Sequence, residues 1–150
     1  MARFRFRLQR VLDLREQVVG VRRLALAAAL AREREAREHL DALEGEMSRR
    51  LQDLAARERE GATVAELAPL RRYLERLGQE REQARTLLEA ARAEVARRRD
   101  ELVRARQEAR VLERLRERRL QQHRQDELRS EQALADDLVQ SRLQSPTQEV

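Results

Sequence analysis

Apolar residues recur at alternating steps of three and four along the second half of the chain. Twelve of the fourteen positions in this series are apolar, and the exceptions are Arg81 and Arg98. The series is Leu67, Leu70, Leu74, Leu77, Arg81, Ala84, Leu88, Ala91, Val95, Arg98, Leu102, Ala105, Ala109 and Leu112. A seam this narrow suits one partner helix, because a globular helix needs a broader apolar face. The spacing predicts a long helix packed against one other helix.

The composition argues against a compact domain with a sizeable core. Charged residues make up 41% of the 150 residues and aromatic residues only 2%, whereas about a quarter of an ordinary soluble protein is charged. Leu and Ala would have to fill a core almost alone. Ala, Glu, Leu and Arg dominate, which is typical of long helices and coiled coils. The fold class expected is therefore all-α.

Apolar residues also recur at helical spacing in the first sixty residues. The spacing is less regular there, and the residues form two stripes. The first stripe is Phe4, Leu8, Val11, Leu14, Val18, Val21, Ala25 and Ala28, and the second is Leu40, Leu43, Met47, Leu51 and Leu54. Helical spacing within each stripe predicts one face of a first helix.

One plausible interruption separates the two helical patterns. Gly61 can end the first helix, and Thr63 can cap the next, with Glu66 completing a capping box. Because Pro69 falls inside the second pattern, either 64–68 forms a separate short turn or the second helix starts near Pro69. The boundaries predicted are a first helix over about 3–60, a turn over about 61–69 and a second helix over about 70–144, in a single hairpin of residues 1–144 with a disordered tail at 145–150.

A connection this short makes the two helices antiparallel. If the turn centres near Thr63, residue n lies opposite roughly 127 − n, so Phe4 comes close to His123 and residues beyond about 125 overhang. The predicted fold is a long antiparallel two-helix coiled-coil hairpin.

Charge is divided unevenly along this hairpin. Residues 1–34 carry nine Arg against three acidic residues, and residues 97–129 carry twelve Arg against seven. Because antiparallel pairing brings these segments to the same end, that end is basic, and the turn end is slightly acidic. Such a distribution orients a protein towards a negatively charged partner.

The residues that enzymes and metal sites need are missing or dispersed. The chain has no Cys, and its two histidines, His39 and His123, are far apart by the pairing rule, so no metal site is expected. Asp136 and Asp137 are adjacent and diverge on a helix, so they cannot act jointly as acid and base. No phosphate-binding loop or nucleophile elbow is present. No catalytic activity and no cofactor are predicted, and no segment is apolar enough for a signal peptide or a membrane span.

The opening Phe4-Arg5-Phe6-Arg7-Leu8-Gln9-Arg10-Val11-Leu12-Asp13-Leu14-Arg15-Glu16 resembles the start of the flagellar export protein FliJ family. Those proteins begin with two Phe one residue apart, followed by Leu, Val-Leu and Leu-Arg at these spacings. Two further segments, Tyr73-Leu74-Glu75-Arg76-Leu77 and 111–119, are similar to stretches of the family. The total length and the two-helix layout agree with the resemblance.

The resemblance implies a non-enzymatic, stalk-like part of the flagellar type III export apparatus. Family members insert into the hexameric export ATPase, promote its ring, and contact the export gate protein of the inner membrane and a substrate chaperone. A cytoplasmic location at the face of that membrane follows, with peripheral association through the apparatus. The ring contact implied is Phe4, Phe6, Leu8 and Val11, and the gate contact implied is Tyr73, Leu77 and Ala84, with Glu80 beside them.

Other interpretations of the same residues stay open. Phe4 and Phe6 can equally form a hydrophobic staple that seals the open end of the hairpin against Leu120 and His123. The equivalent stalk of a virulence injectisome has the same composition. A third reading is a basic coiled coil that binds nucleic acid or an anionic membrane, although acidic residues interleave with the arginines and no aromatic platform for bases accompanies them. No specific nucleic-acid partner is expected.

Overall fold

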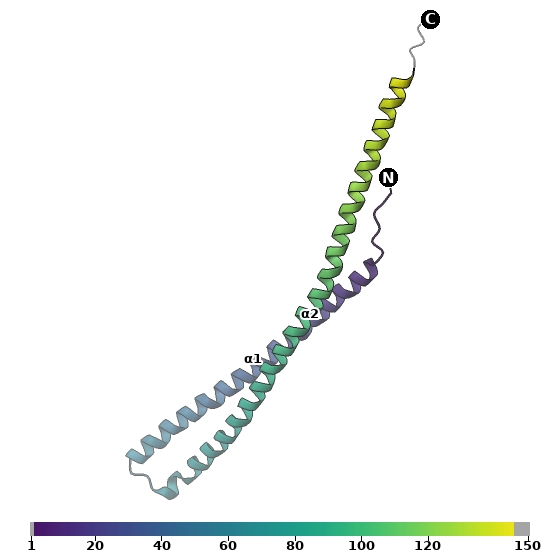
Figure 1. Cartoon of the computed structure of the whole chain (residues 1–150). Coiled ribbons are helices and arrows are strands. Elements are labelled where there is room, and N and C mark those ends of the chain that lie inside the picture. The colour runs from purple at the N-terminus through teal and green to yellow at the C-terminus, as the bar shows by residue number, and fades with distance from the viewer. Residues whose placement is uncertain (1, 146–150) are drawn as a thin grey trace. The chain divides into compact units, whose positions relative to one another are not determined.

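Two helices make up the regular structure of the chain. The computed structural model describes residues 2–145, with α1 over Gln9–Arg59 and α2 over Val64–Gln144 (Figure 1). Contacts divide the chain into unit 1, Met1–Val18 with Ala105–Val150, and unit 2, Val19–Arg104. Each unit joins a segment of α1 to a segment of α2 that runs the opposite way. The predicted antiparallel two-helix hairpin is confirmed, and the predicted disordered tail lies, apart from Ser145, outside the described residues.

Two local motifs make the turn in unit 2. The amide of Gly61 donates to the carbonyl of Glu58 at 3.2 Å, and the amide of Ala62 donates to the carbonyl of Arg57 at 3.0 Å. These are the two bonds of a Schellman motif, and Gly61 has the positive φ of 86° that the motif requires. The predicted capping box follows, because Thr63 N donates to Glu66 Oε2 and Glu66 N donates to Thr63 Oγ1, each at 3.2 Å.

The second helix starts earlier than the predicted boundary near residue 70. It begins at Val64, directly after the Thr63 cap, and Pro69 lies inside it. Proline at this position removes the one hydrogen bond that its amide would make to the carbonyl of Ala65. Ala65 and Pro69 are both exposed, so water can solvate that carbonyl, and the capping box decides where the helix begins.

The predicted seam of α2 is confirmed over its whole length. All fourteen positions from Leu67 to Leu112 are buried or half-buried. Arg98, one of the two charged exceptions, keeps its aliphatic stem in the seam while its guanidinium bonds Glu94 and Glu101 at 2.8 and 3.2 Å. Burial on α2 ends at Glu127, and residues 128–145 are all exposed, as the predicted overhang requires.

The seam of α1 differs from the first predicted stripe. Val11, Leu14, Val18 and Val21 are exposed. One continuous series of buried and half-buried α1 positions in unit 2 instead follows strict steps of three and four: Val19, Arg22, Leu26, Ala29, Glu33, Ala36, Leu40, Leu43, Met47, Arg50 and Leu54. This series contains every residue of the second predicted stripe except Leu51. Arg50 occupies the seam position instead of Leu51. Three charged residues in the seam explain why apolar spacing alone pointed to the wrong face.

The charged groups of the α1 seam residues lie at the edge of the helix pair. Arg22 bonds Glu101 at 3.3 Å, and Glu33 lies 3.9 Å from Arg92. Between these edges the core of unit 2 is a cluster of Leu40, Leu43, Leu77, Ala84 and Leu88, with Ala36, Met47 and Tyr73 packed against it. Apolar burial within a narrow band, flanked by ion pairs, is the packing of a two-stranded coiled coil.

Candidate functional site

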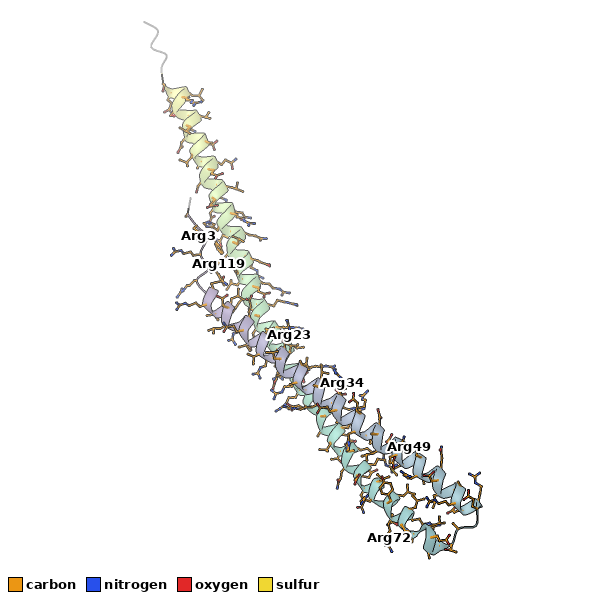
Figure 2. The ribbon with its side chains drawn as sticks, turned by 180° about the vertical axis from the view of Figure 1, so that it is seen from behind. Arg3, Arg23, Arg34, Arg49, Arg72 and Arg119 are labelled. Carbon is orange, nitrogen blue, oxygen red and sulfur yellow. The ribbon has the colours of Figure 1, made fainter. Side chains whose placement is uncertain are left out.

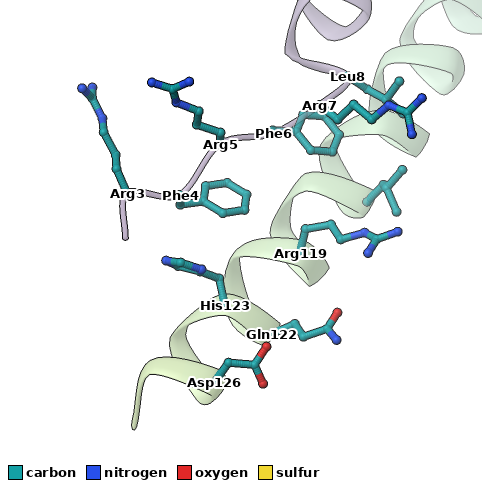
Figure 3. A pocket seen from close by; sticks show the side chains of 11 residues that line it. Arg3, Phe4, Arg5, Phe6, Arg7, Leu8, Arg119, Gln122, His123 and Asp126 are labelled. Carbon is teal, nitrogen blue, oxygen red and sulfur yellow. The ribbon is translucent and has the colours of Figure 1, made fainter. Parts of the chain in front are cut away.

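Residues 2–8, the N-terminal arm, precede α1 in unit 1 and are not helical, although the sequence predicted a helix from about residue 3. Phe4, Phe6 and Leu8 are half-buried, and the arginines between them are exposed. A helix would place Phe4 and Phe6 on different faces, whereas an extended chain puts alternate residues on one side. Figure 3 shows Phe4 lying toward α2 while Arg3 and Arg5 point away from it. The arm is irregular and ends in a turn, in which Gln9 N donates to the carbonyl of Phe6 at 3.1 Å.

Phe4 is held between two residues of α2. Its ring centroid lies 5.7 Å from that of His123, and the Arg116 guanidinium lies 5.8 Å from the ring centroid. Arg116 also donates from Nε to Gln9 Oε1 at 3.1 Å. The predicted approach of Phe4 to His123 is confirmed, and the stapling interpretation of Phe4 describes its packing in this structure.

His123 also fastens the backbone of the arm. Its Nε2 lies 3.1 Å from the carbonyl oxygen of Ala2 and 3.2 Å from Oε1 of Glu127. Both neighbours are acceptors, so Nε2 carries the proton in this arrangement. The arm is thus tied to α2 by a hydrogen bond at its start and by an aromatic contact two residues later.

The arm and α2 enclose a cleft of about 790 Å³ (Figure 3). Its lining combines apolar and basic side chains, and its residues are Arg3, Phe4, Arg5, Phe6, Arg7, Leu8, Leu115, Arg119, Gln122, His123 and Asp126. Three of the four predicted ring-contact residues, Phe4, Phe6 and Leu8, are in this lining. The fourth, Val11, is exposed on α1.

Tyr73 marks a second candidate surface, in unit 2. Its ring packs against the core cluster, and its hydroxyl donates to Glu46 Oε1 at 3.2 Å. The guanidinium groups of Arg76 and Arg50 lie 5.2 and 6.0 Å from the ring centroid. Tyr73 is therefore half-buried, with cations over its ring and a carboxylate at its tip.

Glu46 is the centre of this polar group. Arg50 Nε donates to its Oε1 at 2.8 Å, and an Arg49 nitrogen donates to its Oε2 at 3.0 Å. The hydrogen bond from Arg50, followed by that from Arg49, lowers the pKa of Glu46 from 4.5 to about 2. The carboxylate accepts from Tyr73 as an anion over the whole physiological range.

The other two predicted gate-contact residues are buried members of the core cluster. Leu77 is 4% exposed and Ala84 is 2% exposed. A partner could touch them only where the two helices separate. Of the three residues predicted, Tyr73 alone presents surface in the closed helix pair, and the predicted gate contact stays a prediction.

Sequence reasoning missed the partners of both aromatic residues. The partner of Phe4 is Arg116, and the partners of Tyr73 are Glu46, Arg50 and Arg76. In the sequence, these four look like ordinary charged residues of a helix surface. The pairing rule brings Glu46 near Tyr73 only to within two helical turns, so no local pattern singles it out.

Metal chemistry and membrane spanning find no support in residues 2–145. Within that range no three His, Asp or Glu side chains gather in a way that could hold a metal ion. Neither α1 nor the described length of α2 has a stretch apolar enough to cross a bilayer.

A family model described as the flagellar FliJ protein matches residues 4–147, from the first Phe of the arm to beyond the end of α2. The chain belongs to the flagellar FliJ protein family. Its arm, turn and heptad seams are thus those of a FliJ family member, and the resemblance of the opening block is confirmed.

Comparisons with individual proteins add a structural neighbour. No curated protein sequence matches this FliJ family chain. Among solved structures it is similar to CT670 from Chlamydia trachomatis, described as a putative YscO homologue, at 20% sequence identity. The similarity covers 95% of this chain and 96% of that chain, with a TM-score of 0.47.

Proposed function

We propose that this chain is a non-enzymatic, stalk-like component of the bacterial flagellar protein export apparatus. The observation that carries the proposal is the FliJ family match over residues 4–147, which includes both helices and the arm. In this role the protein promotes the ring of the hexameric export ATPase. It also links that ring to the membrane export gate and to substrate chaperones, and flagellum assembly and motility depend on it.

The proposed mechanism follows from the asymmetry of a two-helix hairpin. A six-fold ring that holds such a hairpin cannot contact it equally through all six subunits. Differential contacts bias one state of the ring over another, and a second contact with the gate couples that state to export. The protein would act at the cytoplasmic face of the inner membrane, held there by its partners.

Unit 1 carries the proposed ring contact. The cleft gathers Phe4, Phe6 and Leu8, and Val11 stands exposed on the first turn of α1. The test is the ATPase rate of the same organism's purified export ATPase, titrated with the wild-type protein and with Phe4→Ala/Phe6→Ala. Leu51→Ala/Val64→Ala is the matched control, because it removes two exposed apolar side chains of unit 2.

Saturable stimulation by the wild type and by the control, lost in the Phe variant, is the expected result. Circular dichroism on each variant establishes that the helices are intact. If the folded wild-type protein leaves the ATPase rate unchanged at every concentration, the ring-promoting mechanism is wrong.

The proposed gate contact centres on Tyr73, with Leu77 and Ala84 supporting it from the core. Titration calorimetry with the cytoplasmic domain of the export gate protein tests this surface. Tyr73→Ala is expected to weaken binding by about tenfold, the size typical of an aromatic anchor. Leu87→Ala, an exposed residue elsewhere on α2, is expected to leave it unchanged. Equal binding by both variants would remove Tyr73 from the gate contact.

A further inference from the structure

The arginines of the two units differ in how they are paired. In unit 2, eleven of nineteen arginines lie within 4.0 Å of a carboxylate oxygen. Unit 1 has fourteen arginines, and within the described residues only Arg15 lies that close to a carboxylate oxygen; it bonds Glu108 at 2.7 Å. Across residues 2–145, most arginines of unit 2 are therefore ion-paired within the unit, and most arginines of unit 1 are not.

Most of the unpaired arginines of unit 1 lie in the N-terminal arm or in the nearby segments of α1 and α2. Residues 2–10 and 114–124 contain nine arginines and one acidic residue, Glu117. Within residues 2–145 none of the nine is ion-paired; they are Arg3, Arg5, Arg7, Arg10, Arg114, Arg116, Arg118, Arg119 and Arg124. Arg3 of the arm and Arg119 of α2, both labelled in Figure 2, line the same cleft.

The N-terminal arm exposes three of these arginines, Arg3, Arg5 and Arg7. Arg3 and Arg5 precede a turn that contains Arg7, in which Gln9 N donates to the carbonyl of Phe6 at 3.1 Å. Each guanidinium can hold a carboxylate through two parallel hydrogen bonds. The arm thus presents three such groups beside the cleft, with no acidic residue between them.

We propose that Arg3, Arg5 and Arg7 of the arm, with Arg119 across the cleft, bind an acidic helical segment of a partner protein. This inference rests on the proposed function, in which the partner is the export ATPase. It assigns the charged contact to the arginines and leaves Phe4 to fix the arm on α2. The half-buried Phe6 and Leu8 add apolar surface to a cleft lined by four arginines and one acidic residue, Asp126, which suits an acidic helix with one apolar face.

The same features disfavour a membrane or a nucleic acid as the ligand. An interfacial segment needs its aromatic side chains free to enter the bilayer, and single-stranded nucleic acid needs aromatic faces for base stacking. Phe4 is instead packed between His123 and Arg116. Phe4 is therefore not free to enter a bilayer or to stack on a base, whereas the arginines of the arm are exposed.

Binding of the full-length protein to the purified export ATPase of the same organism tests the inference. We would measure the dissociation constants of the wild type and Arg3→Gln/Arg5→Gln/Arg7→Gln by titration at 50 and 300 mM salt. The control is Arg23→Gln/Arg34→Gln/Arg72→Gln, which makes the same charge change in unit 2 (Figure 2). Those three arginines are also exposed and form no ion pair within the described residues.

The arm variant is expected to bind about tenfold or more weakly at the lower salt and to lose most of the salt dependence. The control is expected to bind within about twofold of the wild type. If the arm variant binds as tightly as the wild type, or if the control loses binding equally, the proposed arginine contact is wrong but the proposed function still stands. Absence of wild-type binding to the ATPase, with binding to anionic vesicles or DNA instead, overturns both.

Discussion

The hydroxyl of Tyr73 on α2 donates a 3.2 Å hydrogen bond to Glu46 on α1, whose carboxylate also holds Arg49 and Arg50. This bond links α2 to the facing helix α1 within unit 2. Because a tyrosine with a fixed hydroxyl and a packed ring loses little freedom on binding, the arrangement preorganises Tyr73 for a contact.

Removing the hydroxyl should weaken this link without disturbing the core. Tyr73→Phe keeps the ring against the core cluster and loses only the bond to Glu46, so we expect the Tm to fall by about 1–4 °C. Tyr73→Ala also loses the ring and should lower the Tm further. Thermal unfolding followed by circular dichroism measures both. Equal Tm values for Tyr73→Phe and the wild type would mean that the bond contributes nothing to stability.

Stability should depend on the charge of Glu46 in a defined range of pH. Its pKa is lower in the folded chain, about 2, than its ordinary value of 4.5. The stabilisation is therefore complete above pH 4.5 and is lost as the pH falls through about 2. We expect the Tm difference between the wild type and Glu46→Gln to be constant from pH 7 to about 5 and to shrink between about 4.5 and 2.

A matched substitution separates this effect from general acid denaturation. Glu75→Gln removes an exposed carboxylate for which the described residues provide no ion pair. Its Tm should follow that of the wild type at every pH. If the Tm difference between the wild type and Glu46→Gln is as large at pH 2 as at pH 7, the proposed role of the carboxylate is wrong.

Adjacent leucines on α2 should differ sharply in their contribution to stability. Leu88 is 5% exposed in the core cluster, and Leu87 beside it is 63% exposed. Leu88→Ala should lower the free energy of unfolding by about 2–4 kcal/mol, because it removes buried methyl groups and leaves a cavity. Leu87→Ala should change it by less than about 0.5 kcal/mol. Urea denaturation compares the two, and similar losses would disprove the seam assignment.

Local signals in the sequence were sufficient for much of this fold. The heptad spacing of α2 and the Thr63–Glu66 capping box each depend on residues close together in the chain, and both are confirmed. The seam of α1 was hidden because Arg22, Glu33 and Arg50 occupy apolar positions and satisfy their charges at the edges. Strict three-and-four spacing that tolerates charged residues would have found it.

The candidate site was less predictable, since its contacts join distant parts of the chain. The arm contains no helix breaker, so a helix was predicted from about residue 3, whereas residues 2–8 are not helical. Arg116 and Glu46 acquire their roles from residues 112 and 27 positions away, respectively. Interactions at such separations depend on the register of two helices, which local patterns do not determine.

Two glycines of unit 2 should respond to alanine with opposite signs. Gly61 has a φ of 86°, which an alanine adopts only with strain, so Gly61→Ala should destabilise the chain by about 1 kcal/mol. Gly78 lies inside α2, and a Cβ built there meets no described atom within 4 Å. Gly78→Ala should stabilise the chain by roughly 0.5–1 kcal/mol, since glycine costs a helix that much. Urea denaturation of both variants against the wild type measures the two shifts. A stabilising Gly61→Ala would mean that the chain turns without the Schellman motif, and a destabilising Gly78→Ala would mean that a partner helix packs more closely there than in this hairpin.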